Sequence, residues 1–188
     1  MRTMFLAALA APLLVLAACD AAAPSSASDA LEAEATPTAD ARHGTRGLSA
    51  VRRATARYHR VDRAVADGWG AVAVSECVEH PVLGGMGHHY VHLGHLFDGG
   101  ALDPATPEAL LYEPQKNGRL RLVAVEYIVS FDDESRPGDG GTAPELFGQT
   151  FHPSEPAGGW ALHVWAWRHN PAGMFEDFNP RVSCEHAE

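Results

Sequence analysis

The segment of residues 84–97, GGMGHHYVHLGHLF, contains four histidines among glycines and apolar residues. Imidazole is the side chain best suited to bind a transition metal or to exchange a proton near neutral pH. In a helix, His88, His92 and His95 would lie on one face. In a strand, His89 would point to the face opposite His88 and His92. The local secondary structure therefore decides which histidines could act together.

The composition of this segment favours a strand. Each glycine costs a helix about 1 kcal/mol, and the segment contains four of them. Tyr90 and Val91 are residue types that prefer strands. We predict a strand over residues 87–93, with His95 in the loop beyond it. His89 is then the inward histidine, and the other three are local additions at the surface.

Two further polar residues lie in the middle of apolar strands. Glu126 is within the predicted strand 120–131, LRLVAVEYIVSF, and His163 is within the predicted strand 159–168, GWALHVWAWR. A carboxylate among apolar neighbours is costly unless it is paired, hydrogen-bonded or bound to a metal. If the strands are neighbours, His89, Glu126 and His163 converge, and two imidazoles with one carboxylate form a common ligand set for zinc or non-haem iron. The alternative is structural: Glu126 pairs with a buried arginine or tyrosine, and His163 is a core histidine.

Four residues near these ligands are candidates for the surroundings of the site. The thioether of Met86 suits copper, although a core methionine is the simpler reading. Tyr90 and Tyr127 could donate protons or hydrogen bonds, or could be core aromatics. Trp165 shares the predicted face of His163.

The remaining pattern predicts an α+β domain. Residues 49–67 carry apolar side chains at three- and four-residue steps and predict one amphipathic helix, with Ser49 as its cap and Gly68 ending it. Residues 69–78 predict a strand, and residues 103–112 a turn followed by a short helix. No regular alternation of strands and helices occurs, so we expect the helix to pack on a mostly antiparallel sheet with long loops.

The N-terminal residues predict export. Residues 1–18 combine a basic start with an apolar run too short for a membrane span, and Leu16-Ala17-Ala18-Cys19 resembles a bacterial lipoprotein signal. The resemblance implies cleavage before Cys19 and lipid attachment to its sulfur. Residues 19–47 then form a disordered tether, and residues 48–188 a single domain. We expect a protein of the cell envelope, anchored to a membrane by lipid (on the periplasmic side in a Gram-negative cell).

Two cysteines remain once Cys19 carries lipid. An oxidising compartment favours a disulfide between Cys77 and Cys184. The alternative is that both are thiolate ligands of a metal.

Composition and motifs exclude several functions. The 188 residues carry a formal charge of -10, which argues against general nucleic-acid binding. The chain has no Gly-x-Ser-x-Gly motif and no glycine-rich phosphate loop before a helix.

Several segments of the chain resemble a family of exported bacterial proteins, including lipoproteins, of unassigned function. The segments fit the patterns GxMGxHY, VEYxV, LHVWxW and NPxGxFxxxNP, and the resemblance spans about Leu48 to Cys184. It implies a shared pocket but no substrate. The residues of this chain that match the pattern are Met86, Gly87, His89, Tyr90, Glu113, Glu126, Tyr127, His163, Trp165, Asn170, Pro171, Asn179, Pro180 and Cys184.

Three functions fit these features. The first is a lipid-anchored binding protein whose pocket holds a transition metal (zinc, copper or iron) or a small ligand. The second is a metalloenzyme that uses the same two histidines and one carboxylate. The third is a structural protein of the envelope in which the polar residues satisfy one another.

Overall fold

The structure is a computed structural model that describes residues 39–131 and 142–187. The predicted signal peptide, the lipidation site Cys19 and the tether before residue 39 lie outside the described residues, as does most of the predicted loop after residue 131. No helix in the described part of the chain is both long enough and apolar enough to cross a membrane.

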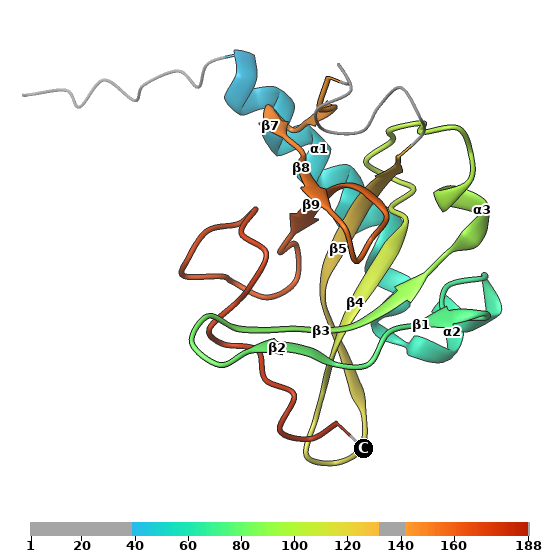
Figure 1. The fold of residues 1–188 in the computed structure, drawn as a ribbon, viewed down its shortest axis with the longest axis vertical. Helices are drawn as coiled ribbons and strands as arrows, with labels where there is room; N and C mark the ends of the chain where they lie inside the picture. The colour runs from blue at the N-terminus through green and yellow to red at the C-terminus, as the bar shows by residue number, and fades with distance from the viewer. Residues whose placement is uncertain (1–38, 132–141, 188) are drawn as a thin grey trace, which may run out of the picture. The chain divides into compact units, whose positions relative to one another are not determined.

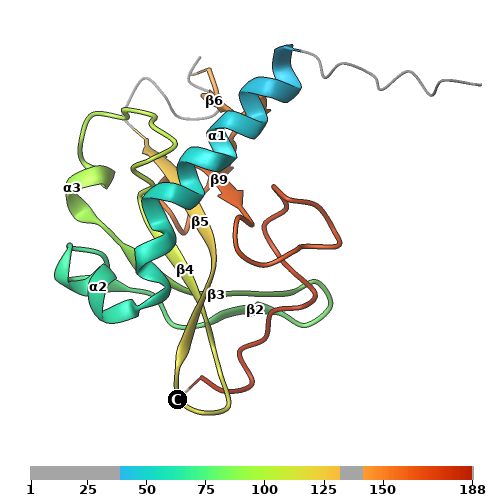
Figure 2. The same ribbon diagram turned by 180° about the vertical axis from the view of Figure 1, so that it is seen from behind.

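Helical segments are few and lie mainly at the start of the described chain (Figures 1 and 2). They are α1 (Ala39–Thr55), the 3-10 helix η1 (Ala56–His59), α2 (Val61–Ala66) and the short α3 (Leu93–Leu96). The strands are β1 (Ala73–Val74), β2 (Val78–His80), β3 (Gly84–Val91), β4 (Ala109–Pro114), β5 (Leu120–Ser130), β6 (Glu145–Leu146), β7 (Gln149–Thr150), β8 (His152–Ser154) and β9 (Gly159–Val164).

Seven of the strands form one antiparallel sheet. Its order is β1-β3-β4-β5-β9-β8, with β2 added to β3, while β6 and β7 form a separate hairpin. The predicted α+β class with a mostly antiparallel sheet is therefore confirmed. The predicted strand 120–131 is confirmed as β5. It lies inside the sheet, where it pairs with β4 on one side and with β9 on the other.

The two faces of the sheet have different coverings. One face packs against the N-terminal helices, through buried residues that include Val51, Tyr58 and Tyr112; α1 crosses in front of this face in Figure 2. The other face packs against the C-terminal segment through Trp165 and Val182. In the described part of the chain, the N-terminal helices thus cover one face, and the segments that build the site lie on the other.

The predicted single helix over residues 49–67 is wrong in its bounds. Helix α1 begins at Ala39, inside the segment predicted as a tether, and Ser49 lies within the helix, not at its cap. The helical path is interrupted at Arg60, whose backbone is extended. The buried Thr55 accepts a hydrogen bond from Trp167 Nε1 and so ties the end of α1 to the segment that follows β9. Tertiary contact thus overrides the continuous pattern. Gly68 follows α2 with a φ of +109°, as predicted for its end.

Three other predicted elements are corrected. The strand over residues 69–78 shrinks to β1 and the start of β2, with a turn before them. The short helix near residues 103–112 is instead strand β4, fully buried between β3 and β5. The strand 159–168 ends at Val164, because the chain then turns so that the Trp167 and Arg168 N–H groups both donate to the Val123 carbonyl.

Candidate metal centre

Three strands carry the predicted ligands onto one face of the sheet. Glu126 on β5 is directly opposite His163 on β9. On its other side Glu126 is in register with Ala109 of β4, while His89 lies beyond β4 on β3. Ala109 has only a methyl side chain, which leaves room for the His89 and Glu126 side chains to approach each other above β4. The alternation of the strands and one small residue therefore bring the three together.

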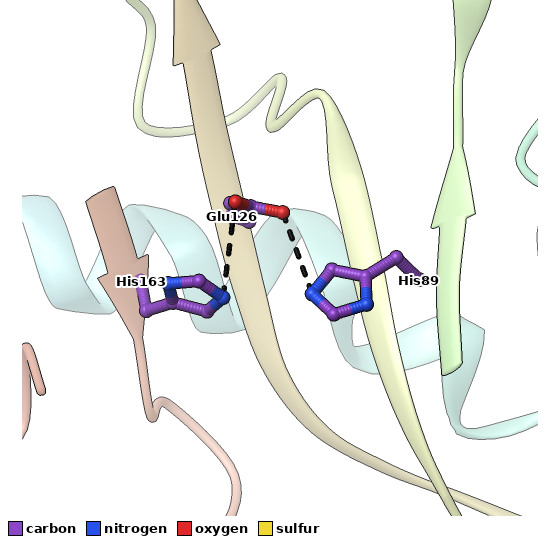
Figure 3. Close-up of side chains that lie close together, drawn as sticks. All are labelled: His89, Glu126 and His163. Carbon is purple, nitrogen blue, oxygen red and sulfur yellow. Dashed lines mark ion pairs between the residues drawn. The ribbon is translucent and has the colours of Figure 1, made fainter. Parts of the chain in front are cut away.

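The three side chains converge in the structure (Figure 3). His89 Nε2 lies 3.6 Å from Glu126 Oε2, and His163 Nε2 lies 3.8 Å from Glu126 Oε1. Their side chains are 13%, 6% and 4% exposed for His89, Glu126 and His163. Both distances exceed those of a normal hydrogen bond, about 2.7–3.2 Å. The cluster is close but is not closed by direct hydrogen bonds between these atoms.

Ser75 holds the orientation of His89. Its hydroxyl accepts the His89 backbone N–H at 2.9 Å and lies 2.7 Å from the Glu76 carbonyl, to which it donates. The same hydroxyl lies 3.2 Å from His89 Nδ1, where it is placed to accept a proton from the ring. This contact turns His89 Nε2 toward Glu126.

Asp177 does the same for His163. Asp177 Oδ1 lies 3.1 Å from His163 Nδ1 and 3.3 Å from His152 Nε2. Since a carboxylate only accepts, Nδ1 of His163 carries the proton. His163 Nε2 is buried and has no hydrogen-bond partner among the described residues. Such a carboxylate–histidine pair is the usual outer support of a metal-binding imidazole.

The pKa shifts follow from burial and from these partners. Burial lowers the pKa of His89, more than neighbouring Glu126 raises it. Burial also opposes protonation of His163, but Glu126 and the hydrogen bond to Asp177 together raise its pKa. The hydrogen bond to Asp177 raises the pKa of His152. Burial alone would raise the pKa of Asp177, but its hydrogen bonds to His152 and His163 hold that pKa far below its usual range. Asp177 is thus ionised at neutral pH, as a support for an imidazole ligand must be.

A cavity of about 320 Å³ opens onto the three ligands. His152, Asp177 and Ser75 also line it, together with apolar side chains. The volume lies at the lower end of the range for small-molecule pockets, about 300–1,000 Å³. The site therefore has room for more than a metal ion.

The C-terminal segment that carries Asp177 is tied down at several points. Cys77 and Cys184 form a disulfide, as predicted, across 107 residues of sequence. Asn179 exchanges two backbone hydrogen bonds with Gly85 of β3. The approach is so close that a side chain on Gly85 would lie 2.9 Å from a backbone oxygen of this segment. These ties place Asp177 against His163 before any ligand arrives.

Of the four residues predicted around the site, two lie near it. Met86 lines the cavity. Trp165 is buried on the same face and donates its indole N–H to the Glu176 carbonyl, so it positions Asp177 through the neighbouring peptide. The prediction for Tyr90 and Tyr127 is wrong. They alternate with His89 and Glu126 along their strands and lie on the opposite face, where Tyr90 packs against Tyr112 and Tyr127 donates to the Pro104 carbonyl.

The other residues singled out by the resemblance have structural places. Buried Asn170 donates to the Phe178 carbonyl, and buried Asn179 donates to the His169 carbonyl. Both amides thus hold the C-terminal segment. Glu113 lies opposite Arg121 at the far end of β4, outside the cavity.

The remaining histidines of the glycine-rich segment have partners of their own. His88 Nδ1 lies 3.0 Å from the Ser75 carbonyl, and His95 Nδ1 lies 2.8 Å from the Pro107 carbonyl. His92 caps α3 by accepting the His95 backbone N–H, and its ring packs between Trp69 and His95. All three are half-buried and have structural contacts, so they are not local additions at the surface as predicted. Strand β3 ends at Val91 and not at residue 93, and His95 lies in α3 and not in a loop.

Sequence reasoning missed Ser75, His152 and Asp177. His152 on β8 is in register with Ala161 of β9. Ala161 precedes His163 by two residues, so His152 lies on the same face of the sheet as His163. A strand containing His152-Pro153 carries little signal of its own, because proline is rare inside sheets. Asp177 belongs to a loop, so no periodicity could indicate its direction.

Comparison of the chain with protein-family models, with characterised proteins and with solved structures finds no match. The resemblance to exported bacterial proteins therefore stays a prediction. What the geometry itself establishes is that one ligand atom from each of His89, Glu126 and His163 lies within 4.8 Å of the others, so that the three could hold a metal ion.

Proposed function

We propose that this protein binds one divalent transition-metal ion through His89 Nε2, a Glu126 carboxylate oxygen and His163 Nε2. The observation that carries the proposal is the orientation of the two imidazoles. Each has its Nδ1 held by a partner on the outer side, and each turns its Nε2 toward the same carboxylate without a direct hydrogen bond. A mutually satisfied polar cluster would instead place a donor against the carboxylate at hydrogen-bond distance.

The spacing of the donors supports a single ion. Donors held about 2.0–2.1 Å from one tetrahedral ion lie about 3.3 Å apart. The two imidazoles lie 3.6 and 3.8 Å from different oxygens of Glu126, and one donor atom from each of the three residues lies within 4.8 Å of the others. Side-chain rotations that close these separations would bring the donors to that value. Two histidines and one carboxylate suit zinc first and ferrous iron second. Copper is a weaker candidate, since it would need the Met86 thioether as a further ligand.

A metalloenzyme is a second candidate function, favoured by the cavity. Catalytic zinc sites use three protein ligands and keep the fourth position open for water or substrate. Here the protein supplies three ligands, and the cavity of about 320 Å³ reaches them. A bound ion would supply a Lewis acid or an activated water in that cavity, beside His152. Exchange of ¹⁷O-labelled water at a bound paramagnetic ion tests for the open position; complete absence of exchange argues against an enzyme.

The proposed location is the cell envelope, with lipid on Cys19. The signal-like residues 1–19 support this, together with the Cys77–Cys184 disulfide, which fits an oxidising compartment. Incorporation of labelled palmitate into the wild-type chain but not into a Cys19→Ala variant is the expected result. Equal labelling of both chains would remove the anchor from the proposal.

Metal content and affinity test the proposed function. We expect the full chain, purified without added metal, to contain close to one ion per molecule, and the His89→Ala and His163→Ala variants to contain almost none. His95→Ala is the matched control, because it removes an imidazole from the same part of the chain but outside the site. Circular dichroism of each variant shows whether the fold is retained. Equal metal content in all four folded proteins would refute the site.

A further inference from the structure

The cavity over the proposed metal centre is lined by both polar and apolar side chains. The polar ones include the three ligand side chains with Asp177 and His152. The apolar ones, here called wall residues, come from four segments of the chain: Val78, Met86, Val91, Ile128 and Phe178. A site that only stores an ion has no need of an apolar chamber above it.

Several of these wall residues expose apolar surface into the cavity. Val78, Met86, Val91 and Phe178 are only partly buried, although each belongs to a strand or a tethered segment. Partly exposed apolar side chains gathered in a concavity are typical of a binding site for an apolar group. Burying them against a ligand would remove apolar surface from water and so make the free energy of ligand binding more favourable.

The walls are held in place without a ligand. Ile128 belongs to the central strand β5, and Val91 belongs to β3. Phe178 lies in the C-terminal segment, where Asn170 holds its carbonyl and the Gly85–Asn179 hydrogen bonds fix the next residue. Its ring also contacts His80 of β2, with the centroids 5.5 Å apart. A preformed chamber costs little to order on binding, which favours small ligands.

From these observations we infer that the metal centre is an anchor for a small organic ligand. The ligand coordinates the ion at its open position through an oxygen-bearing head and places an apolar body of a few carbon atoms against Val91, Ile128 and Phe178. This inference rests on the proposed metal site and adds the chemical class of molecule that the site takes. His152 also lines the cavity and is placed to form a hydrogen bond with the oxygen-bearing head of the ligand.

A homologous series of metal-binding probes tests the inference. The full chain is loaded with Co²⁺, and its visible absorption is followed while acetohydroxamate, butyrohydroxamate or hexanohydroxamate is added. Each methylene that enters an apolar site contributes about 0.8 kcal/mol, or about fourfold in affinity. We therefore expect the affinity to rise about three- to fourfold per methylene from the shortest probe to the longest.

Variants place the effect in the cavity. Ile128→Thr keeps a β-branched shape and reduces the apolar wall, so it is expected to weaken hexanohydroxamate more than acetohydroxamate. Val72→Thr is the matched control, because Val72 is 80% exposed and does not line the cavity. In this variant the affinity should rise with hydroxamate length as it does in the wild type.

Each outcome is informative. A cobalt spectrum that responds equally to all three probes would overturn the inference about the apolar body and leave the metal site standing. A spectrum that responds to none of them would show that no position is open, with the same consequence. Failure of Co²⁺ to bind, seen directly as the absence of the bound-ion spectrum, would overturn both the metal site and the ligand inference.

Discussion

Glu108, directly before β4, and Glu126, within β5, are both buried acidic residues. As whole residues they are 1% and 4% exposed. Their surroundings differ. Glu108 Oε2 accepts the Ile128 backbone N–H at 2.9 Å, and burial raises the pKa of Glu108 to about 8. Glu126 instead faces two imidazole nitrogens at distances too long for a hydrogen bond. A buried carboxyl group satisfied by the backbone is part of the fold, whereas one that faces two imidazoles without direct hydrogen bonds is suited to share a cation with them.

The largest effect expected from this comparison is on metal affinity. Glu126→Gln removes the charged ligand while keeping the shape, and we expect it to weaken zinc binding by more than about a hundredfold, beyond the range typical of outer-shell changes. Glu108→Gln, the matched substitution in the other buried carboxyl group, should leave affinity within about twofold. Competition with a fluorescent zinc chelator measures both. Similar losses in the two variants would mean that Glu126 acts through stability and not as a ligand.

The second effect concerns stability and its dependence on pH. In the folded state Glu108 keeps its proton up to a pH of about 8, whereas in the unfolded chain it loses it near its ordinary pKa of 4.5. The stability that this group contributes is therefore complete below about pH 4.5 and is lost as the pH rises to about 8. Glutamine has no proton to lose.

At pH 8.5 we accordingly expect Glu108→Gln to have a free energy of unfolding, measured with urea, about 2 kcal/mol higher than that of the wild type. No such gain is expected at pH 4.5. Both proteins are compared with a chelator present, so that metal binding does not contribute. A gain of the same size at both pH values would show that packing, and not the proton, causes it.

The third effect is the smallest and concerns the support of His163. Asp177→Asn keeps an acceptor oxygen but removes the charge that favours the Nδ1 tautomer, and we expect about a tenfold loss of zinc affinity at pH 7. Glu176→Gln, an exposed neighbour outside the cavity, is the control. An unchanged affinity in Asp177→Asn would show that the Asp177–His163 pair does not support a ligand.

The same variant also tests the low pKa of Asp177. Because this pKa is lowered by His152 and His163 against the effect of burial, the carboxylate contributes stability above about pH 4, which is lost as the pH falls further. Asp177 is about a third exposed, so solvent screening limits the contribution to about 1 kcal/mol. The metal-free variant should thus be less stable than the wild type at pH 7, with the difference shrinking as the pH falls below about 4 and closing only at the much lower pKa of the folded state.

Alternation along strands explains how much of the site could be predicted. Glu126 and His163 are each flanked by apolar residues at one-residue steps, and the glycines around His89 exclude a helix, so the faces of all three followed from the sequence. The pairing of β5 with β9 and the small Ala109 of β4 then brought them together. The same alternation contradicts Tyr90 and Tyr127 as site residues, since each adjoins a ligand in sequence and therefore points the other way.

Contacts between distant segments account for what could not be predicted. Ser75 meets His89 because β1 pairs with β3, and Asp177 meets His163 because a disulfide and the Gly85–Asn179 hydrogen bonds hold the C-terminal segment. Just before strand β4 the sequence contains Thr106-Pro107, a pair of residue types that favours the start of a helix. The burial of β4 between two strands outweighs that local preference.

The most direct test of the metal centre is the position of the ion itself. Crystals of the full chain grown with zinc and measured at the zinc absorption edge should show one anomalous peak about 2.0–2.2 Å from His89 Nε2, a Glu126 oxygen and His163 Nε2. The Nδ1 atoms should keep Ser75 and Asp177 as partners. A peak bound to other residues, or no peak between these three side chains at saturating zinc, would contradict the proposed centre.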